Sequence, residues 1–193
     1  MRIEFLILYI SMAAWIFPIF RQHKCNIFYF FLLLGLADPL ATLLLYIFHF
    51  NNSYLFVSIA PFLFYSVGIN RTLKFKINSV EVFVFSLTFL LLFIIPNLDI
   101  ILLIVHLLTL IRIIYKIIIQ LHLSMQINTF YLVLAFYMLS SIASLIIYLN
   151  GGHQAIILFY INLSFQILIA IFFSIFREDN PKLTYNISPV DLG

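Results

Sequence analysis

Asp38 is the residue of this sequence best placed to do chemistry, because it lies near the middle of an apolar stretch at residues 25–49. An ionisable group at membrane depth is costly, so it is by default a candidate for a binding site. Pro39 follows and cannot donate a backbone N–H to the Gly35 carbonyl, which leaves an acceptor open beside the acid. The sequence therefore predicts a small polar pocket at Asp38, with a hydrogen bond to a neighbouring helix as the alternative.

Other polar residues lie at similar depth in other apolar stretches, counted at about 1.5 Å per residue from the stretch ends. With Asp38, the candidate ligand-binding residues are Ser66, His106, Ser140, Asn162 and Gln166. Asn162 and Gln166 share one helix face, because they are four residues apart. Asp38 and His106 together could relay a proton or sense pH, but the sequence does not say whether they touch. These residues predict an outward-facing polar pocket, and interhelical hydrogen bonding without a ligand is the alternative.

Several catalytic and cofactor signatures are missing from the sequence. Residues 154–176 contain no lysine that could carry a retinal Schiff base, and no His-Glu-x-x-His or Gly-x-Ser-x-Gly occurs. The single cysteine, Cys25, excludes an internal disulfide and a cysteine-built metal site. We therefore expect no cofactor, no metal site and no catalytic residue, and the sequence does not point to an enzyme.

The composition predicts the fold class that positions these residues. Hydrophobic residues make up 65% of the chain and charged residues 9%, whereas soluble domains carry about 25% charge. Apolar runs near the roughly 20 residues of a spanning helix predict an all-α, polytopic bundle of seven transmembrane helices. The predicted helices are 3–20, 25–49, 54–70, 78–95, 99–119, 128–149 and 154–176. Residues 1–176 then form the transmembrane domain, and residues 177–193 form a short cytoplasmic tail.

The positions of the basic residues predict the orientation. All Lys and Arg residues except Arg2 fall in clusters at alternate links: Arg21/Lys24, Arg71/Lys74/Lys76, Arg112/Lys116 and Arg177/Lys182. The intervening links at 51–53, 96–99 and 150–153 have none. This positive-inside pattern predicts a multi-pass protein of the inner (plasma) membrane, with the N-terminus outside and the C-terminus cytoplasmic. The positive charge is thus explained by topology and does not indicate nucleic-acid binding.

The basic residues are also candidates for contact with anionic lipid or a cytoplasmic partner. These candidates are Arg71, Lys74, Lys76, Arg112, Lys116 and Arg177. Arg112 and Lys116 are four residues apart near a helix end, where we expect their long stems to reach the headgroups. Glu81 enters its helix from the same side, and we expect it to pair with Arg71, Lys74 or Lys76.

The prolines bear on a comparison with transporters. The order of three helices, a linking helix and three helices is similar in topology and size to sugar transporters of the SWEET type. However, Pro18, Pro39 and Pro61 occupy the first three predicted helices, where we expect kinks, and the last three contain no proline. Those transporters share prolines between their halves, so the resemblance stops at topology.

The sequence favours two function classes and gives less support to a third. The first is a sensory, signalling or accessory module that binds a small or lipid-like ligand and relays to a cytoplasmic or membrane partner. The second is a small-solute transporter or channel with Asp38 lining the path, which predicts pseudo-symmetry between the two helix triplets. The third is an intramembrane lipid enzyme, which requires Asp38 and His106 in contact or bridged by water.

A family resemblance favours the first class. Three features carry it: the acid in Ala37-Asp38-Pro39, an Asn-containing link before an aromatic third helix, and an Asn-bearing last helix that ends in Phe176-Arg177-Glu178-Asp179. In these features the chain resembles small seven-helix membrane proteins of Bacteroidetes that are encoded beside sensor histidine kinases. The resemblance implies a signalling partner in the membrane or the cytoplasm.

Overall fold

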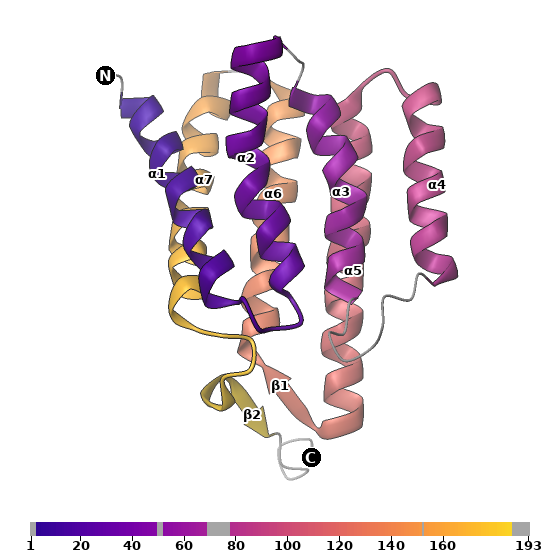
Figure 1. Ribbon diagram of the computed structural model, residues 1–193, viewed down its shortest axis with the longest axis vertical. Coiled ribbons are helices and arrows are strands. Elements are labelled where there is room, and N and C mark those ends of the chain that lie inside the picture. The colour runs from indigo at the N-terminus through magenta and orange to yellow at the C-terminus, as the bar shows by residue number, and fades with distance from the viewer. Residues whose placement is uncertain (1–2, 50–51, 69–77, 152, 187–193) are drawn as a thin grey trace.

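The computed structural model describes residues 3–49, 52–68, 78–151 and 153–186. The prediction of an all-α fold with seven helices is confirmed (Figure 1). The helices are α1 (Ile3–Arg21), α2 (Phe28–Phe48), α3 (Asn52–Gly68), α4 (Ser79–Ile94), α5 (Leu98–Ser124), α6 (Thr129–Asn150) and α7 (His153–Ile175).

Short polar residues set several helix starts. The Asn97 side chain accepts a hydrogen bond from the Asp99 amide before α5, and the Asn128 side chain accepts one from the Phe130 amide before α6. Asn78 and Glu81 form a capping box at the start of α4. α5 continues to Ser124 instead of ending at residue 119, so its last turns extend past the predicted span.

Six of the helices form a closed ring. α1 contacts α2 and α7, α3 contacts α2 and α5, and α6 contacts α5 and α7. α4 lies outside this ring, and within the described chain its main contacts are with α3 and α5. Figure 1 shows α4 at one edge of the molecule, apart from the other helices. The ring therefore has a centre to which α4 does not contribute.

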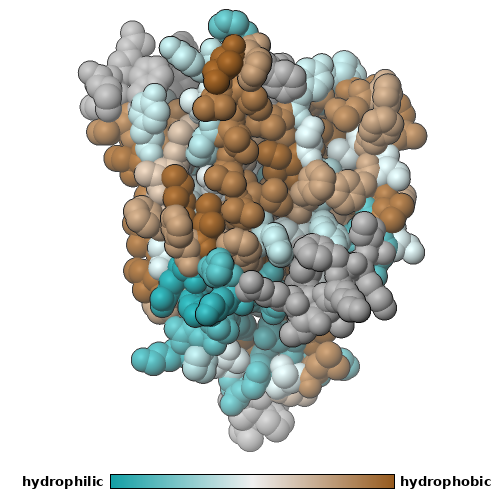
Figure 2. All heavy atoms as spheres, in the orientation of Figure 1, coloured by the Kyte–Doolittle hydropathy of each residue, from teal (hydrophilic) through white to brown (hydrophobic). Residues whose placement is uncertain are grey.

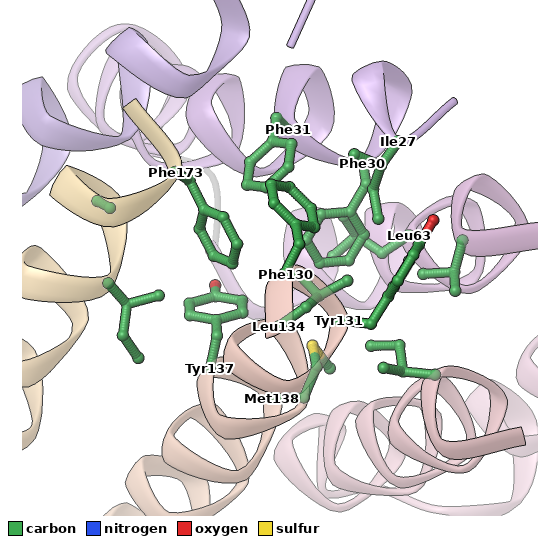
Figure 3. Packing of buried hydrophobic residues seen from close by; sticks show 14 of the residues in the cluster. Ile27, Phe30, Phe31, Leu63, Phe130, Tyr131, Leu134, Tyr137, Met138 and Phe173 are labelled. Atoms are coloured by element: carbon green, nitrogen blue, oxygen red, sulfur yellow. The ribbon is translucent and has the colours of Figure 1, made fainter. Parts of the chain in front are cut away.

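Aromatic side chains from several of the ring helices pack against one another in the core (Figure 3). The ring of Phe173 on α7 lies 4.8 Å from Phe31 on α2 and 4.9 Å from Phe130 on α6, between centroids. Trp15 on α1 lies 4.6 Å from Tyr137 on α6. Tilted and edge-on pairs of this kind add roughly 0.5–1.5 kcal/mol each beyond the area they bury. They join four helices of the ring.

The C-terminal segment folds back onto the bundle, which the sequence did not predict. Strand β2 (Thr184–Asn186) pairs antiparallel with strand β1 (Gln126–Asn128), which lies between α5 and α6. A short 3-10 helix (Pro181–Leu183) leads into β2. The described part of the predicted tail is therefore docked on the link between α5 and α6.

The apolar helices suit a membrane. α2, α5, α6 and α7 are long and apolar enough to cross one, whereas α1, α3 and α4 are shorter apolar helices. The view in Figure 2 shows apolar side chains over most of the helices and hydrophilic ones gathered where the strands lie. We call that end, where α1 and α3 stop and β1 and β2 pair, the basic end. The described Lys and Arg residues all belong to elements that meet there: Arg21, Lys24, Arg112, Lys116, Arg177 and Lys182.

Candidate functional site

A cavity of about 170 Å³ lies at the centre of the ring, and we call it the central cavity. All six ring helices line it. The lining residues are Ser11, Trp15, Leu34, Ala37, Asp38, Phe56, Ile59, Leu63, Leu102, His106, Tyr137, Leu163 and Gln166. Three of the candidate residues, Asp38, His106 and Gln166, therefore come together from α2, α5 and α7.

Asp38 contributes a carboxyl group for which the described residues provide no hydrogen-bond or ion-pair partner. Its backbone carbonyl accepts a hydrogen bond of 2.9 Å from the Thr42 hydroxyl. Its side-chain oxygens accept none from any residue that the structure describes. Pro39 lies inside α2, so the Gly35 carbonyl also lacks its usual helical donor. Because Asp38 lines the central cavity, its carboxyl oxygens are available to water or a ligand there.

His106 is oriented by its own helix. Its Nδ1 atom lies 2.9 Å from the Leu102 carbonyl oxygen, which can only accept, so Nδ1 carries the proton of this hydrogen bond. In the neutral ring Nε2 is then an acceptor. Within the described chain no hydrogen bond or ion pair joins His106 to Asp38, although both line the central cavity.

Two aromatic residues that the sequence did not single out also line the cavity. Trp15 and Tyr137 line it from α1 and α6, with their ring centroids 4.6 Å apart. Aromatic faces attract cations. An unpartnered carboxyl, an imidazole acceptor and two aromatic rings together make a lining suited to a positively charged or hydrogen-bond-donating guest.

Asn162 and Ser140 lie outside the central cavity. The Asn162 amide donates to the Ser140 carbonyl oxygen at 2.7 Å and to the Ser144 hydroxyl, and the Ser140 hydroxyl donates to the Asn162 side-chain oxygen. These bonds join α6 to α7. They are the interhelical hydrogen bonds that the alternative interpretation of the polar layer described.

Ser66 also lies away from the cavity. Its buried hydroxyl donates to the Leu63 carbonyl oxygen of its own helix at 2.7 Å. Counting residues predicts a shared level for Ser66 and Asp38, but it does not predict the direction of the Ser66 side chain.

The expectation that the Arg112 side chain extends to the lipid headgroups is corrected by the structure, in which Arg112 is paired within the protein. Its guanidinium forms an ion pair with Glu81 of α4 and lies 4.5 Å from the centre of the Phe64 ring. Its side chain is 19% exposed and that of Glu81 only 2%. The partners expected for Glu81 were Arg71, Lys74 or Lys76, which lie outside the described residues; the pairing with Arg112 was not expected.

Lys116 and Arg177 both make contacts near the docked tail. Lys116 Nζ lies 4.0 Å from a carboxylate oxygen of Glu178 and 4.4 Å from the centre of the Tyr131 ring. Arg177 pairs with Asp179 at 2.9 Å. Both basic side chains remain partly exposed.

Glu178 is the residue that anchors the tail. Its carboxylate accepts hydrogen bonds from the Tyr131 hydroxyl and from the Ile27 amide at 3.2 Å. Its backbone amide donates to the Gln22 side-chain oxygen, and its carbonyl oxygen accepts from the Asn128 side chain. Glu178 therefore ties the α1–α2 link to the start of α6.

Gln22 extends this anchor into α7. Its buried side-chain amide donates to the Phe173 carbonyl oxygen at 2.9 Å and to the Phe176 carbonyl oxygen at 2.7 Å. Sequence reasoning missed Gln22 and Glu178. The available signal was the run of three charged residues directly after an apolar helix, Arg177-Glu178-Asp179, and such a run is usually solvated.

The remaining predictions concern prolines, metals and relatives. Pro18, Pro39 and Pro61 lie inside α1, α2 and α3. Among the residues described, no three His, Cys, Asp or Glu side chains are grouped so as to hold a metal.

Comparison with protein-family models, curated proteins and solved structures finds no match to this chain. The resemblance to small Bacteroidetes membrane proteins therefore stays a prediction.

Proposed function

We propose that this chain is a multi-pass inner-membrane protein whose seven helices all span, with the N-terminus outside and the C-terminus cytoplasmic. The gathering of the described basic residues at one end supports this orientation, because positive residues favour the cytoplasmic side. The three shorter helices need a thin or locally deformed bilayer, which costs only fractions of a kcal/mol per ångström of mismatch.

The topology is tested with single cysteines in a Cys25→Ser background. Single cysteines replace Asn97 or Gly151 on one side of the membrane and Lys182 on the other. Intact cells that carry each variant are treated with a membrane-impermeant maleimide. We expect labelling at Asn97 and Gly151 only. Labelling at Lys182 would contradict the proposed orientation.

We further propose a sensory or signalling module in which the central cavity binds a small cationic solute. The unpartnered carboxyl of Asp38 at the centre of the ring is the observation that carries this proposal. A volume of about 170 Å³ has room for roughly five waters at about 30 Å³ each. A lipid-like ligand is too large, so of the ligands suggested by the sequence the small one is retained.

A contiguous set of contacts supports a relay from the cavity to the basic end. The Trp15 ring, which lines the cavity, lies 6.4 Å from the Phe173 ring. The Phe173 carbonyl oxygen accepts from Gln22, whose side-chain oxygen accepts from the Glu178 amide. A change in the position of Trp15 can thus reach the docked tail, where a cytoplasmic or membrane partner would bind.

Transport is the second candidate, because the ring has a repeating contact pattern. The contacts of α1 with α2, α2 with α3 and α3 with α5 correspond to those of α5 with α6, α6 with α7 and α7 with α1. Two triplets with α4 as a linker would generate this pattern. The lipid-enzyme hypothesis has less support, since Asp38 and His106 share a cavity without a hydrogen bond between them in the described residues.

The single tryptophan of the chain gives a direct test of binding. Because Trp15 lines the central cavity, its fluorescence should report occupancy. The protein in nanodiscs of zwitterionic lipid is titrated with methylammonium, tetramethylammonium or acetate at constant ionic strength. We expect a saturable change with at least one of the cations and none with acetate.

The variants decide whether Asp38 is responsible. Asp38→Asn should abolish the response, whereas Asp99→Asn, which changes an acid outside the cavity, should keep it. If the Trp15 fluorescence of Asp38→Asn responded to the cation as in the parent protein, the proposal would be wrong. Flux of the binding cation into proteoliposomes then separates the candidates: a sensory module gives none, and a transporter gives flux that Asp38→Asn removes.

A further inference from the structure

The basic end contains a second and larger cavity, which we call the basic-end cavity, with a volume of about 910 Å³. It lies between α5, the α1–α2 link, the start of α6 and the docked tail. The side chains on which the argument rests are Lys24, Arg112, Lys116, Gln120 and Tyr131. We propose that this cavity binds a phosphate-bearing anion, independently of any ligand of the central cavity.

α5 supplies the central part of the site. Arg112, Lys116 and Gln120 follow at intervals of four residues, so they form one stripe of a helix face and all line the cavity. Neighbours at this spacing have Cβ atoms about 5–6 Å apart, so one phosphate group can reach two of them. Arginine offers phosphate a planar fork of donors, and lysine offers a point charge.

Arg112 also has an unused donor. Its ion pair with Glu81 engages Nη2, whereas Nη1 is buried without a hydrogen-bond partner among the described residues. Nη1 has almost no accessible surface, so in this arrangement it is closed off from the cavity. Arg112 lines the cavity, and its contribution to the site is therefore the positive charge of its guanidinium at the wall.

The acids around the cavity are already engaged. The Glu178 carboxylate accepts hydrogen bonds from Tyr131 and Ile27, and Asp179 pairs with Arg177. Lys116 Nζ lies 4.0 Å from a Glu178 carboxylate oxygen, which is longer than a hydrogen bond, and over the face of the Tyr131 ring, which uses none of its N–H donors. Its ammonium donors are therefore available, as is the exposed Lys24.

The size and place of the cavity fit an organic phosphate better than a bare ion. Pockets for organic ligands measure about 300–1,000 Å³, and the basic-end cavity lies within this range. Basic pockets between helices at the cytoplasmic face bind phospholipid headgroups. The same donors would hold a free phosphate ester from the cytoplasm, so the chemistry is shared and the source is a matter for experiment.

Binding to the detergent-solubilised full chain is measured by calorimetry with defined probes. Glycerol 3-phosphate, inorganic phosphate and dihexanoyl phosphatidic acid test the phosphate group, and acetate and dihexanoylglycerol are the controls. Binding of phosphatidic acid alone assigns a lipid headgroup, whereas binding of glycerol 3-phosphate or phosphate assigns a free ligand. Equal binding of acetate, or no binding of any phosphate probe, would overturn the proposal.

Substitutions at Gln120 test the location without removing an ion pair. Gln120→Glu should weaken binding about threefold to tenfold and Gln120→Lys should strengthen it by a similar factor, because each adds one charge close to the phosphate. Lys182→Gln changes a basic residue that does not line the cavity and should leave the affinity within twofold. Equal affinity in Gln120→Glu and Gln120→Lys would place the anion elsewhere and overturn the proposal.

Discussion

The carboxylate of Glu81 on α4 pairs with the guanidinium of Arg112 on α5, and it thereby joins the helix outside the ring to the ring itself. Glu81 serves two structures at once, because its other oxygen accepts a hydrogen bond of 2.8 Å from the Asn78 amide. The start of α4 and the attachment of α4 to the bundle therefore depend on one side chain.

Glu81→Ala should lower the stability of the solubilised protein by about 3–5 kcal/mol, the usual cost of removing one partner of a buried ion pair. Thermal unfolding followed by circular dichroism measures the change. Glu81→Gln is the matched control: it keeps a side chain that can cap α4 but lacks the charge, so its loss should be smaller. An Ala variant as stable as the parent would contradict the role of this pair.

Glu178→Ala should release the docked tail. The Tyr131 hydroxyl and the Ile27 amide would each lose their acceptor, so the amides of β1 and β2 should exchange hydrogen faster. Hydrogen exchange with mass spectrometry checks this. Asp179→Ala changes the neighbouring acid, which is 63% exposed, and should leave exchange in the strands unchanged, since surface ion pairs contribute about 0–1 kcal/mol.

Asn162→Ala should destabilise the bundle by about 1 kcal/mol, a typical size for an interhelical polar contact in a membrane. The titration of Trp15 fluorescence with cations should stay as in the parent, because Asn162 does not line the central cavity. Ser164→Ala, on the same helix, removes a hydroxyl bonded only within α7 and should leave both measurements unchanged. Loss of cation binding in Asn162→Ala would return Asn162 to the ligand site.

Gly35→Ala should push α1 and α2 apart. A Cβ atom at this position would lie 2.5 Å from the Trp15 carbonyl oxygen and 2.8 Å from a side-chain carbon of Ile19. Overpacking of this kind costs about 1–3 kcal/mol, and it should also shift the emission of Trp15 before any ligand is added. Gly68→Ala is a useful comparison, because its Cβ atom would instead meet the guanidinium of Arg112, away from Trp15, and should leave Trp15 emission unchanged.

The helices could be predicted from the sequence because apolar runs and turn residues such as Pro96-Asn97 mark their ends. Counting residues at a constant rise places Asp38, His106 and Gln166 within about one turn of the same level, and all three line the central cavity. Depth alone does not predict whether a side chain reaches the cavity, as three residues show: Ser66, Ser140 and Asn162. A residue count gives the level of a side chain but not its rotation about the axis, which depends on packing against neighbouring helices.

The contacts at the basic end could not be predicted for a different reason. Gln22 and Glu178 are separated by most of the chain, and neither has a local pattern that distinguishes a buried partner from a solvated residue. The strands are three residues each, too short for an alternating pattern to be recognised. Arg112 was expected among lipid headgroups because its pairing with Glu81 depends on where α4 docks.

The ring closes between its first helix and its last, and this has a consequence for biosynthesis. On the topology we propose, α2 would enter the membrane well before α5 and α7 are made, so the carboxyl of Asp38 would have no central cavity to occupy at that stage. At roughly 5–20 residues per second of translation, the interval before Gln166 arrives is on the order of ten seconds. During that time an acid at membrane depth must be tolerated by the insertion machinery, by lipid or by a chaperone.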